Sequence, residues 1–138
     1  MTKTELKEFL DIKVIQYNNP EFITTDPIQI PHAFTKKEDI EIAAFLTATI
    51  AWGNRKSIIT NASRMMELMD HTPHDFILYH SDDDLDRFQG FVHRTFNETD
   101  LSFFVKSLQN IYTHHNGLEA VFAKYTATDN LQTAISKF

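Results

Sequence analysis

An almost wholly apolar stretch, residues 40–52, most constrains how this chain can fold. Charged residues precede it, Gly53 follows it, and Glu41 is its only charged member. A helix that is apolar on nearly every side is stable only when other elements surround it. We therefore expect a buried helix that begins at a Thr35–Glu38 capping box and ends at Trp52, where Gly53 supplies a left-handed cap.

Start signals define the helices on either side of this segment. Thr2 and Glu5 form a capping box for a helix that runs to about Tyr17. Its expected core-facing stripe is Leu6, Phe9, Leu10, Val14 and Tyr17. Across residues 22–34, Pro27 and Pro31 remove backbone donors and restrict their predecessors, which favours an ordered, extended connection.

Asn54 is placed to cap the next helix. The apolar positions of that helix recur at intervals of three and four: Ile58, Ile59, Ala62, Met65, Met66 and Met69. Thr72 and Pro73 predict a short helix to about His80, and residues 81–84 predict a further turn. Residues 88–96 fit a strand-like link or an irregular loop, and the weak alternation around Gly90 favours the loop.

Asn97 and Asp100 predict the start of a long helix that ends near His115, before Gly117. Its shared apolar face comprises Leu101, Phe104, Val105, Leu108, Ile111 and Tyr112. Two shorter helices follow, over residues 118–125 and from about Asn130 to the end. The prediction is a single all-α domain over residues 1–138, an orthogonal bundle of roughly six to eight helices.

Composition removes several classes of function. The chain has no cysteine, so disulfides and thiolate sites are excluded. Residues 1–8 lack the apolar stretch of a signal peptide, and no apolar run approaches about 18 residues, so we expect a cytoplasmic protein without a membrane span. A net charge of −6 opposes a broad nucleic-acid surface but leaves room for a local basic cleft.

Two clusters that could bind metal are better explained as helix starts. His71 and His74 have a spacing compatible with metal ligation, but Thr72 and Pro73 begin a helix between them. The acidic run at residues 82–86 lacks the spaced ligands of a calcium loop and suits a helix N-terminus. No nucleophile elbow or phosphate-binding glycine loop is present in the sequence. We expect no metal and no cofactor.

Three groups form the predicted site. Asn54, Arg55 and Lys56 lie at a helix start, where free N–H groups and two cations suit a phosphate. His93 and Arg94 lie in an apolar segment where they need polar partners. His32 and Trp52 complete the candidate set for binding nucleic acid or an anion. The alternative is that Arg55 and Arg94 pair with acidic residues to tie loops to the core, namely with Glu41, Glu38 or Asp26.

The motifs together resemble a bacterial family, domain of unknown function 2400. The resemblance rests on residues 26–27, 31–34, 39–44, 51–55, 92–94, 96 and 118–122. It implies that this chain is the N-terminal half of a longer protein, distantly similar to helix-hairpin-helix DNA glycosylases, with Trp52 lining a pocket in a partial helical barrel. The hairpin and catalytic aspartate of those enzymes do not occur in residues 1–138, so no catalytic residue is assigned.

Two functions from different classes follow. The first is a glycosylase-like helical domain that binds DNA through the predicted site, with the guanidinium groups of Arg55 and Arg94 reaching the same hollow. The second is a non-catalytic module for protein–protein association, which self-associates through an exposed apolar surface.

Overall fold

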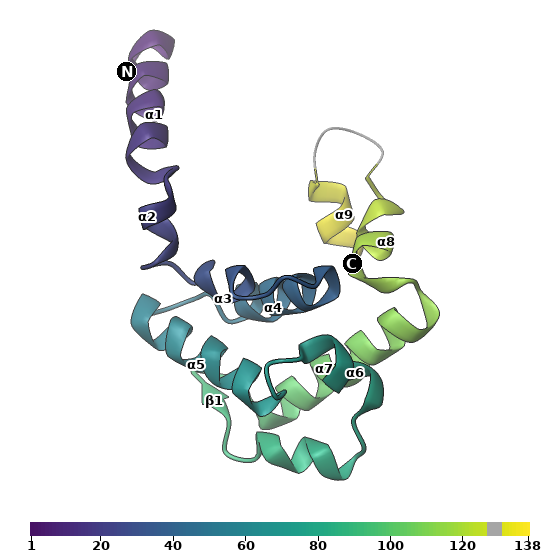
Figure 1. Cartoon of the computed structure of the whole chain (residues 1–138). Coiled ribbons are helices and arrows are strands. Elements are labelled where there is room, and N and C mark those ends of the chain that lie inside the picture. Colours follow the sequence, from purple (N-terminus) through teal and green to yellow (C-terminus); the bar gives the residue numbers. More distant parts are fainter. Residues whose placement is uncertain (127–130) are drawn as a thin grey trace.

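The apolar segment forms the central helix, α4 (Lys37–Thr49), of a computed structural model that describes residues 1–126 and 131–138. It packs against α3, α5, α6 and α8 (Figure 1), and Ile42, Ala43 and Leu46 are fully buried. The Thr35 capping box is absent, since Lys36 is the N-cap and its side chain makes no capping bond. The helix also ends earlier than predicted. Backbone bonds from Ala51 and Trp52 turn the chain, which allows Asn54 to cap the next helix.

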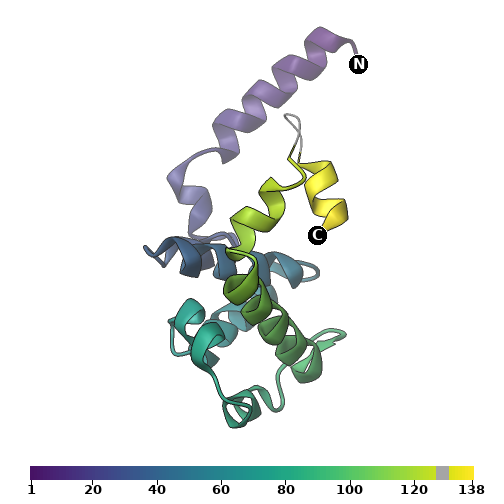
Figure 2. The same ribbon diagram turned by 90° about the vertical axis from the view of Figure 1, so that its right-hand side faces the viewer.

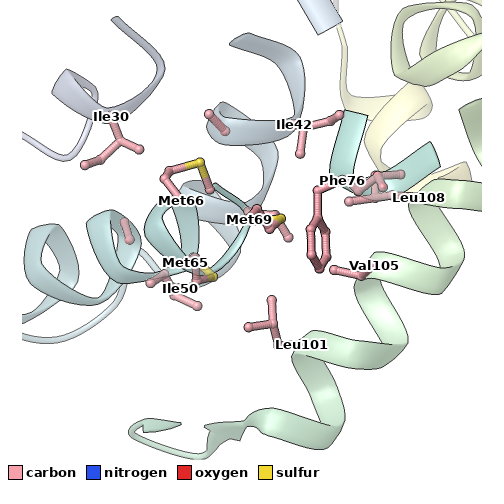
Figure 3. Packing of buried hydrophobic residues seen from close by; sticks show 14 of the residues in the cluster. Ile30, Ile42, Ile50, Met65, Met66, Met69, Phe76, Leu101, Val105 and Leu108 are labelled. Atoms are coloured by element: carbon pink, nitrogen blue, oxygen red, sulfur yellow. The ribbon is translucent and has the colours of Figure 1, made fainter. Parts of the chain in front are cut away.

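Two long helices complete the core as predicted. The Asn54 side chain accepts a hydrogen bond from the Ser57 amide at 3.2 Å to start α5 (Arg55–Leu68). Asn97 and Asp100, which predicted this helix start, form a capping box for α7 (Glu98–His114). Between them lies α6 (Pro73–Tyr79). Figure 3 shows how methionines of α5, Phe76 of α6 and aliphatic residues of α7 meet below α4.

The N-terminal helix α1 (Lys3–Tyr17) has the predicted capping box, but its predicted core-facing stripe is exposed. It projects away from the rest of the molecule (Figures 1 and 2), and none of its residues is buried. The five stripe residues are 41–56% exposed. The error has a simple reason, since helical periodicity identifies an apolar face and not the element that covers it.

Residues 20–34 contain two one-turn helices, so the prediction of an extended connection over residues 22–34 was wrong. They are α2 (Pro20–Ile23) and α3 (Gln29–His32). Pro20 and Pro31 lie within the first turn of their helices, where a backbone N–H has no intrahelical partner and its loss costs little. Between the helices, the Asp26 carboxylate accepts a hydrogen bond from the Ile28 amide at 3.0 Å.

The segment before α7 contains a β-hairpin, which corrects the preferred prediction of an irregular loop. A 3₁₀ helix, η1 (Asp83–Phe88), precedes strands β1 (Val92–His93) and β2 (Phe96–Asn97). The strands are antiparallel, with Val92 opposite Asn97 and His93 opposite Phe96. Arg94 therefore lies in the turn, where its φ of 55° is left-handed. Such short strands leave too few residues for a visible alternation.

The chain ends in α8 (Gly117–Ala123) and α9 (Gln132–Lys137). The predicted start of the last helix at Asn130 lies outside the described residues. The described parts contain nine α-helices and one 3₁₀ helix, and the excess over the expected number comes from the short helices before α4 and from η1. The all-α prediction is confirmed. In the described residues, no helix combines the length and apolarity that crossing a membrane requires.

Candidate functional site

The structure brings together two chain segments that are distant in the sequence, since Trp52 and His93 are 41 residues apart. Trp52 and Gly53 follow α4, and His93 and Arg94 come from the hairpin. We call the exposed residues around this meeting point, Trp52, Arg55, Lys56 and Arg94, the Trp52 surface. Its geometry depends on contacts of His93 and Arg94 with the Trp52 segment, and the start of α5 adds charge.

His93 links the hairpin to Trp52 through one ring nitrogen and to Asn61 of α5 through the other. The residue is only 2% exposed. Its Nε2–H donates to the Trp52 carbonyl oxygen at 3.1 Å, because a carbonyl can only accept. Its Nδ1 accepts from the side-chain amide of Asn61 at 3.0 Å. Both nitrogens of a neutral imidazole are therefore satisfied, which confirms the prediction of polar partners for His93. Arg94, for which polar partners were also predicted, is exposed instead.

Arg94 lies over the face of Trp52. Its guanidinium carbon is 4.7 Å from the ring centroid, which is cation–π geometry. The His93 ring meets the same indole edge-on, at 6.1 Å between centroids. Gly53 makes this approach feasible, because a Cβ at that position would lie 2.9 Å from Nη1 of Arg94. The Trp52 residue is 41% exposed, so part of the indole is open to a ligand.

The start of α5, two residues after Gly53, adds positive charge to the chain segment that follows Trp52. Arg55 and Lys56 are the first two residues of the helix and both are exposed. The N-terminus of a helix carries partial positive charge and unpaired N–H groups, which favour an anion. Asn54 itself acts as the helix cap, so its side chain already has a structural role.

The alternative in which the arginines form ion pairs does not describe this structure. Over residues 1–126 and 131–138, neither Arg55 nor Arg94 forms a salt bridge. The Glu41 carboxylate instead accepts the Tyr112 hydroxyl at 2.8 Å and lies 3.8 Å from the Lys37 ammonium. The cations of the Trp52 surface are therefore uncompensated in the described part of the chain.

One candidate lies apart, and one residue was missed. His32 is an exposed residue at the end of α3, and no side-chain hydrogen bond links it to the Trp52 surface in the described residues. Asn61, which orients His93, did not figure among the predicted residues. It is a polar residue at the edge of the apolar stripe of α5, three positions after the buried Ile58. A polar side chain at such a position was the feature of the sequence that could have identified it.

The histidine and aspartate clusters have structural roles. The Asp39 side chain accepts the His74 backbone amide at 2.9 Å, and the His74 ring packs 5.0 Å from that of Tyr112. Asp84 accepts hydrogen bonds from the Ser81 amide and hydroxyl, as a residue at a helix start should. Within the described ranges, no group of three or more His, Asp or Glu side chains could hold a metal ion.

Comparison with known proteins supports the resemblance seen in the motifs. No curated protein and no solved structure matches the chain. A family model does match, and it covers residues 26–138, that is, every described element from α3 onward, including the Trp52 surface. The chain therefore belongs to the family described as "Protein of unknown function (DUF2400)".

Proposed function

We propose that the Trp52 surface binds nucleic acid, with Arg94, Arg55 and Lys56 near phosphates and Trp52 against a base. The observation that carries this proposal is the guanidinium of Arg94 at 4.7 Å from a half-exposed indole. An arginine and an aromatic ring that share one exposed surface offer both features that single-stranded nucleic acid requires, positive charge and a stacking face.

The charge distribution favours a small footprint. The chain carries a net charge of −6, so an extended polyanion is repelled over most of the molecule. The three cations of the Trp52 surface can neutralise about three phosphates, which corresponds to a slope of log K against log salt of about −2 for a single strand. A weak and salt-sensitive complex with a short segment is expected.

The stacking face favours an unpaired base over an intact duplex. A base inside a duplex presents only its edge, whereas an extruded or single-stranded base can lie flat on an indole. The distant resemblance to DNA glycosylases agrees with this choice, because such enzymes handle extruded bases. The proposal assigns binding to these residues and no catalytic role.

The test uses Trp52 as its own reporter, since it is the only tryptophan in the chain. A short single-stranded oligonucleotide should quench its fluorescence at low salt, and anisotropy of a labelled oligonucleotide should give the same affinity. Arg94→Gln should weaken binding about tenfold. The control is Arg64→Gln, an equal loss of charge at an exposed position further along α5, which should bind like the wild type.

Two results would contradict the proposal. One is an absence of any quenching or anisotropy change at low ionic strength. The other is an equal loss of affinity in the Arg94 and Arg64 variants, because that would show attraction by overall charge without a specific site.

Association through α1 is the second candidate function. Its apolar stripe lies on a projecting helix with no buried residue, and such exposed apolar faces mark sites of protein contact. The charges of this helix balance, with Lys3, Lys7 and Lys13 against Glu5, Glu8 and Asp11. Two copies could therefore meet there without the repulsion expected from the rest of the chain.

Sedimentation velocity tests this association. The wild type should form dimers at micromolar concentrations, and Leu10→Asp in the stripe should convert them to monomers. Ile15→Asp is the matched control, because Ile15 is 79% exposed and lies on the opposite side of α1 from Leu6. A wild-type protein that stays monomeric, or equal effects of both variants, would overturn this candidate.

A further inference from the structure

We infer that the cavity between α4, α7, α8 and α9 binds a small molecule with an apolar body and one anionic head group. This cavity, which we call the phenylalanine cavity, has a volume of about 460 Å³. Its apolar lining includes Phe45, Phe103, Phe104, Ile111, Val121 and Phe138. The residues of the Trp52 surface lie outside it, so the inference does not rest on the proposed function.

A connected set of aromatic rings forms the walls. Phe45 on α4 lies 6.0 Å from Phe104 on α7 and 5.2 Å from Phe138, measured between ring centroids. Phe138 in turn stacks on Phe122 of α8 at 4.6 Å, with an interplanar angle of 10°. These contacts hold the C-terminal end of α9 against the other helices. The cavity is therefore built by side chains from four helices and does not depend on a single loop.

The apolar wall reaches the surface and is open there. Phe103 is 69% exposed although it lies beside Phe104, which packs against the core cluster. An exposed phenylalanine that continues a partly buried aromatic wall can cover the apolar body of a ligand. Ligand cavities of a few hundred Å³ with mainly apolar walls and a few polar groups are the usual form of small-molecule sites in proteins.

The polar groups around the cavity select the charge of the ligand. Lys124, Lys137 and His115 line it, and no Asp or Glu side chain among the described residues does. This is unusual in a chain that has 19 acidic residues against 13 lysines and arginines. In the part of the chain that the structure describes, neither lysine has an ion-pair partner. Two ammonium groups beside an apolar wall suit a carboxylate or a similar head group.

Decanoate is a suitable probe, and its relatives test each part of the inference. Decyltrimethylammonium has the same apolar chain with the opposite charge, and decanol has no charge. Isothermal titration calorimetry below micelle-forming concentrations should show one decanoate bound per chain. The cationic and neutral relatives should bind about tenfold more weakly or worse, since they lose a charge-assisted contact.

Substitutions on the cavity rim complete the test. Lys124→Glu and Lys137→Glu should each weaken decanoate binding about tenfold, whereas Arg64→Glu on α5 should not. Phe103→Ala should also weaken binding, with Tyr79→Ala as control because Tyr79 is 79% exposed and does not line the cavity. All of these positions are exposed, so the variants should fold, and circular dichroism checks that they do.

Three results would overturn the inference. Equal binding of decanoate and decyltrimethylammonium would remove the role of the lysines. Equal effects of the rim variants and their controls would place the ligand elsewhere. Binding of many decanoate molecules per chain would indicate nonspecific adsorption to exposed apolar surface.

Discussion

At the scale of single residues, Gly53 decides how closely two distant segments can approach. Its φ of 105° is a conformation that other residues rarely adopt, and the space beside it is filled by the Arg94 side chain. The stack of Arg94 on Trp52 therefore requires a glycine here for two separate reasons, its backbone conformation and its lack of a Cβ.

Gly53→Ala should lower the free energy of unfolding by about 2–3 kcal/mol, through both backbone strain and the clash with Arg94. Gly90→Ala separates the two causes, because Gly90 has a φ of 77° and no atom within 4 Å of the place that a Cβ would occupy. Gly90→Ala should lower the free energy of unfolding by about 1–2 kcal/mol, through backbone strain alone. Urea denaturation measures both, and equal losses would show that Arg94 moves aside without cost.

Asn61→Leu should destabilise the protein because it leaves the buried Nδ1 of His93 without a donor. The expected cost is about 1–3 kcal/mol, the usual penalty for an unpaired buried polar atom. Thr60→Leu, at the exposed neighbouring position, should change stability by less than about 0.5 kcal/mol. The emission maximum of Trp52 should shift only in the Asn61 variant, since His93 holds the Trp52 carbonyl. An unchanged emission spectrum would argue against that coupling.

Tyr112 should make the stability depend on pH in the alkaline range. Burial, and then the hydrogen bond to Glu41, raise the pKa of its hydroxyl above the ordinary value of 10.0. The folded state therefore disfavours the phenolate. Its contribution to stability is complete below pH 10 and decreases as the pH rises further, by at most about 1.4 kcal/mol per pH unit.

Tyr112→Phe should flatten this decrease, whereas Tyr79→Phe, at a residue 79% exposed, should leave it unchanged. Urea denaturation at several pH values between about 9 and 11 provides the comparison. If the Tyr112 variant and the wild type lose stability in parallel, the hydroxyl does not control the alkaline transition.

At the scale of elements, local sequence signals identified helix starts more reliably than they identified which face of a helix is buried. The caps at Thr2, Asn54 and Asn97 were all confirmed, because each needs only a side chain and an amide two or three residues away. The Thr35 cap failed although its spacing was equally good. The exposed α1 stripe failed for another reason, since no nearby residue specifies what covers a helix.

Removal of residues 1–17 should leave the folded body intact. Because α1 buries no residue, its loss should change the free energy of unfolding of the remaining chain by less than about 1 kcal/mol. Urea denaturation monitored at Trp52 measures this, because the reporter lies outside the deleted helix. The deletion should also remove part of the helical circular dichroism signal, and a collapse of the transition would show that α1 supports the core.

At the scale of the whole molecule, one core holds the parts together. Residues from α3, α4, α5, α6, η1, α7 and α8 contribute to a single buried cluster. The predicted inner faces of α5 and α7 were correct because this core covers them, whereas the equally periodic stripe of α1 is uncovered. The Trp52 surface and the phenylalanine cavity both lie beside elements of this core.

Two residues of α7 that lie two positions apart compare the stability cost of a buried side chain with that of an exposed one. Leu101→Ala should cost about 2–5 kcal/mol because Leu101 is fully buried. Phe103→Ala should cost less than about 1 kcal/mol, since its larger side chain is mostly exposed. Thermal or urea unfolding measures both, and similar losses would mean that Phe103 is buried in solution by a partner.

The sequence by itself determined the all-α class, most helix starts and the inner faces of α5 and α7. The helix starts depend on hydrogen bonds within three residues, and the apolar faces depend on the spacing of residues along a helix, both of which the order of amino acids specifies directly. Only the tertiary structure decided that Trp52 and Gly53 meet His93 and Arg94, that Asn61 holds His93, and that α1 lies outside the core. Those contacts join residues far apart in the chain, and they form because the packing of the whole molecule brings them within hydrogen-bonding and van der Waals distance.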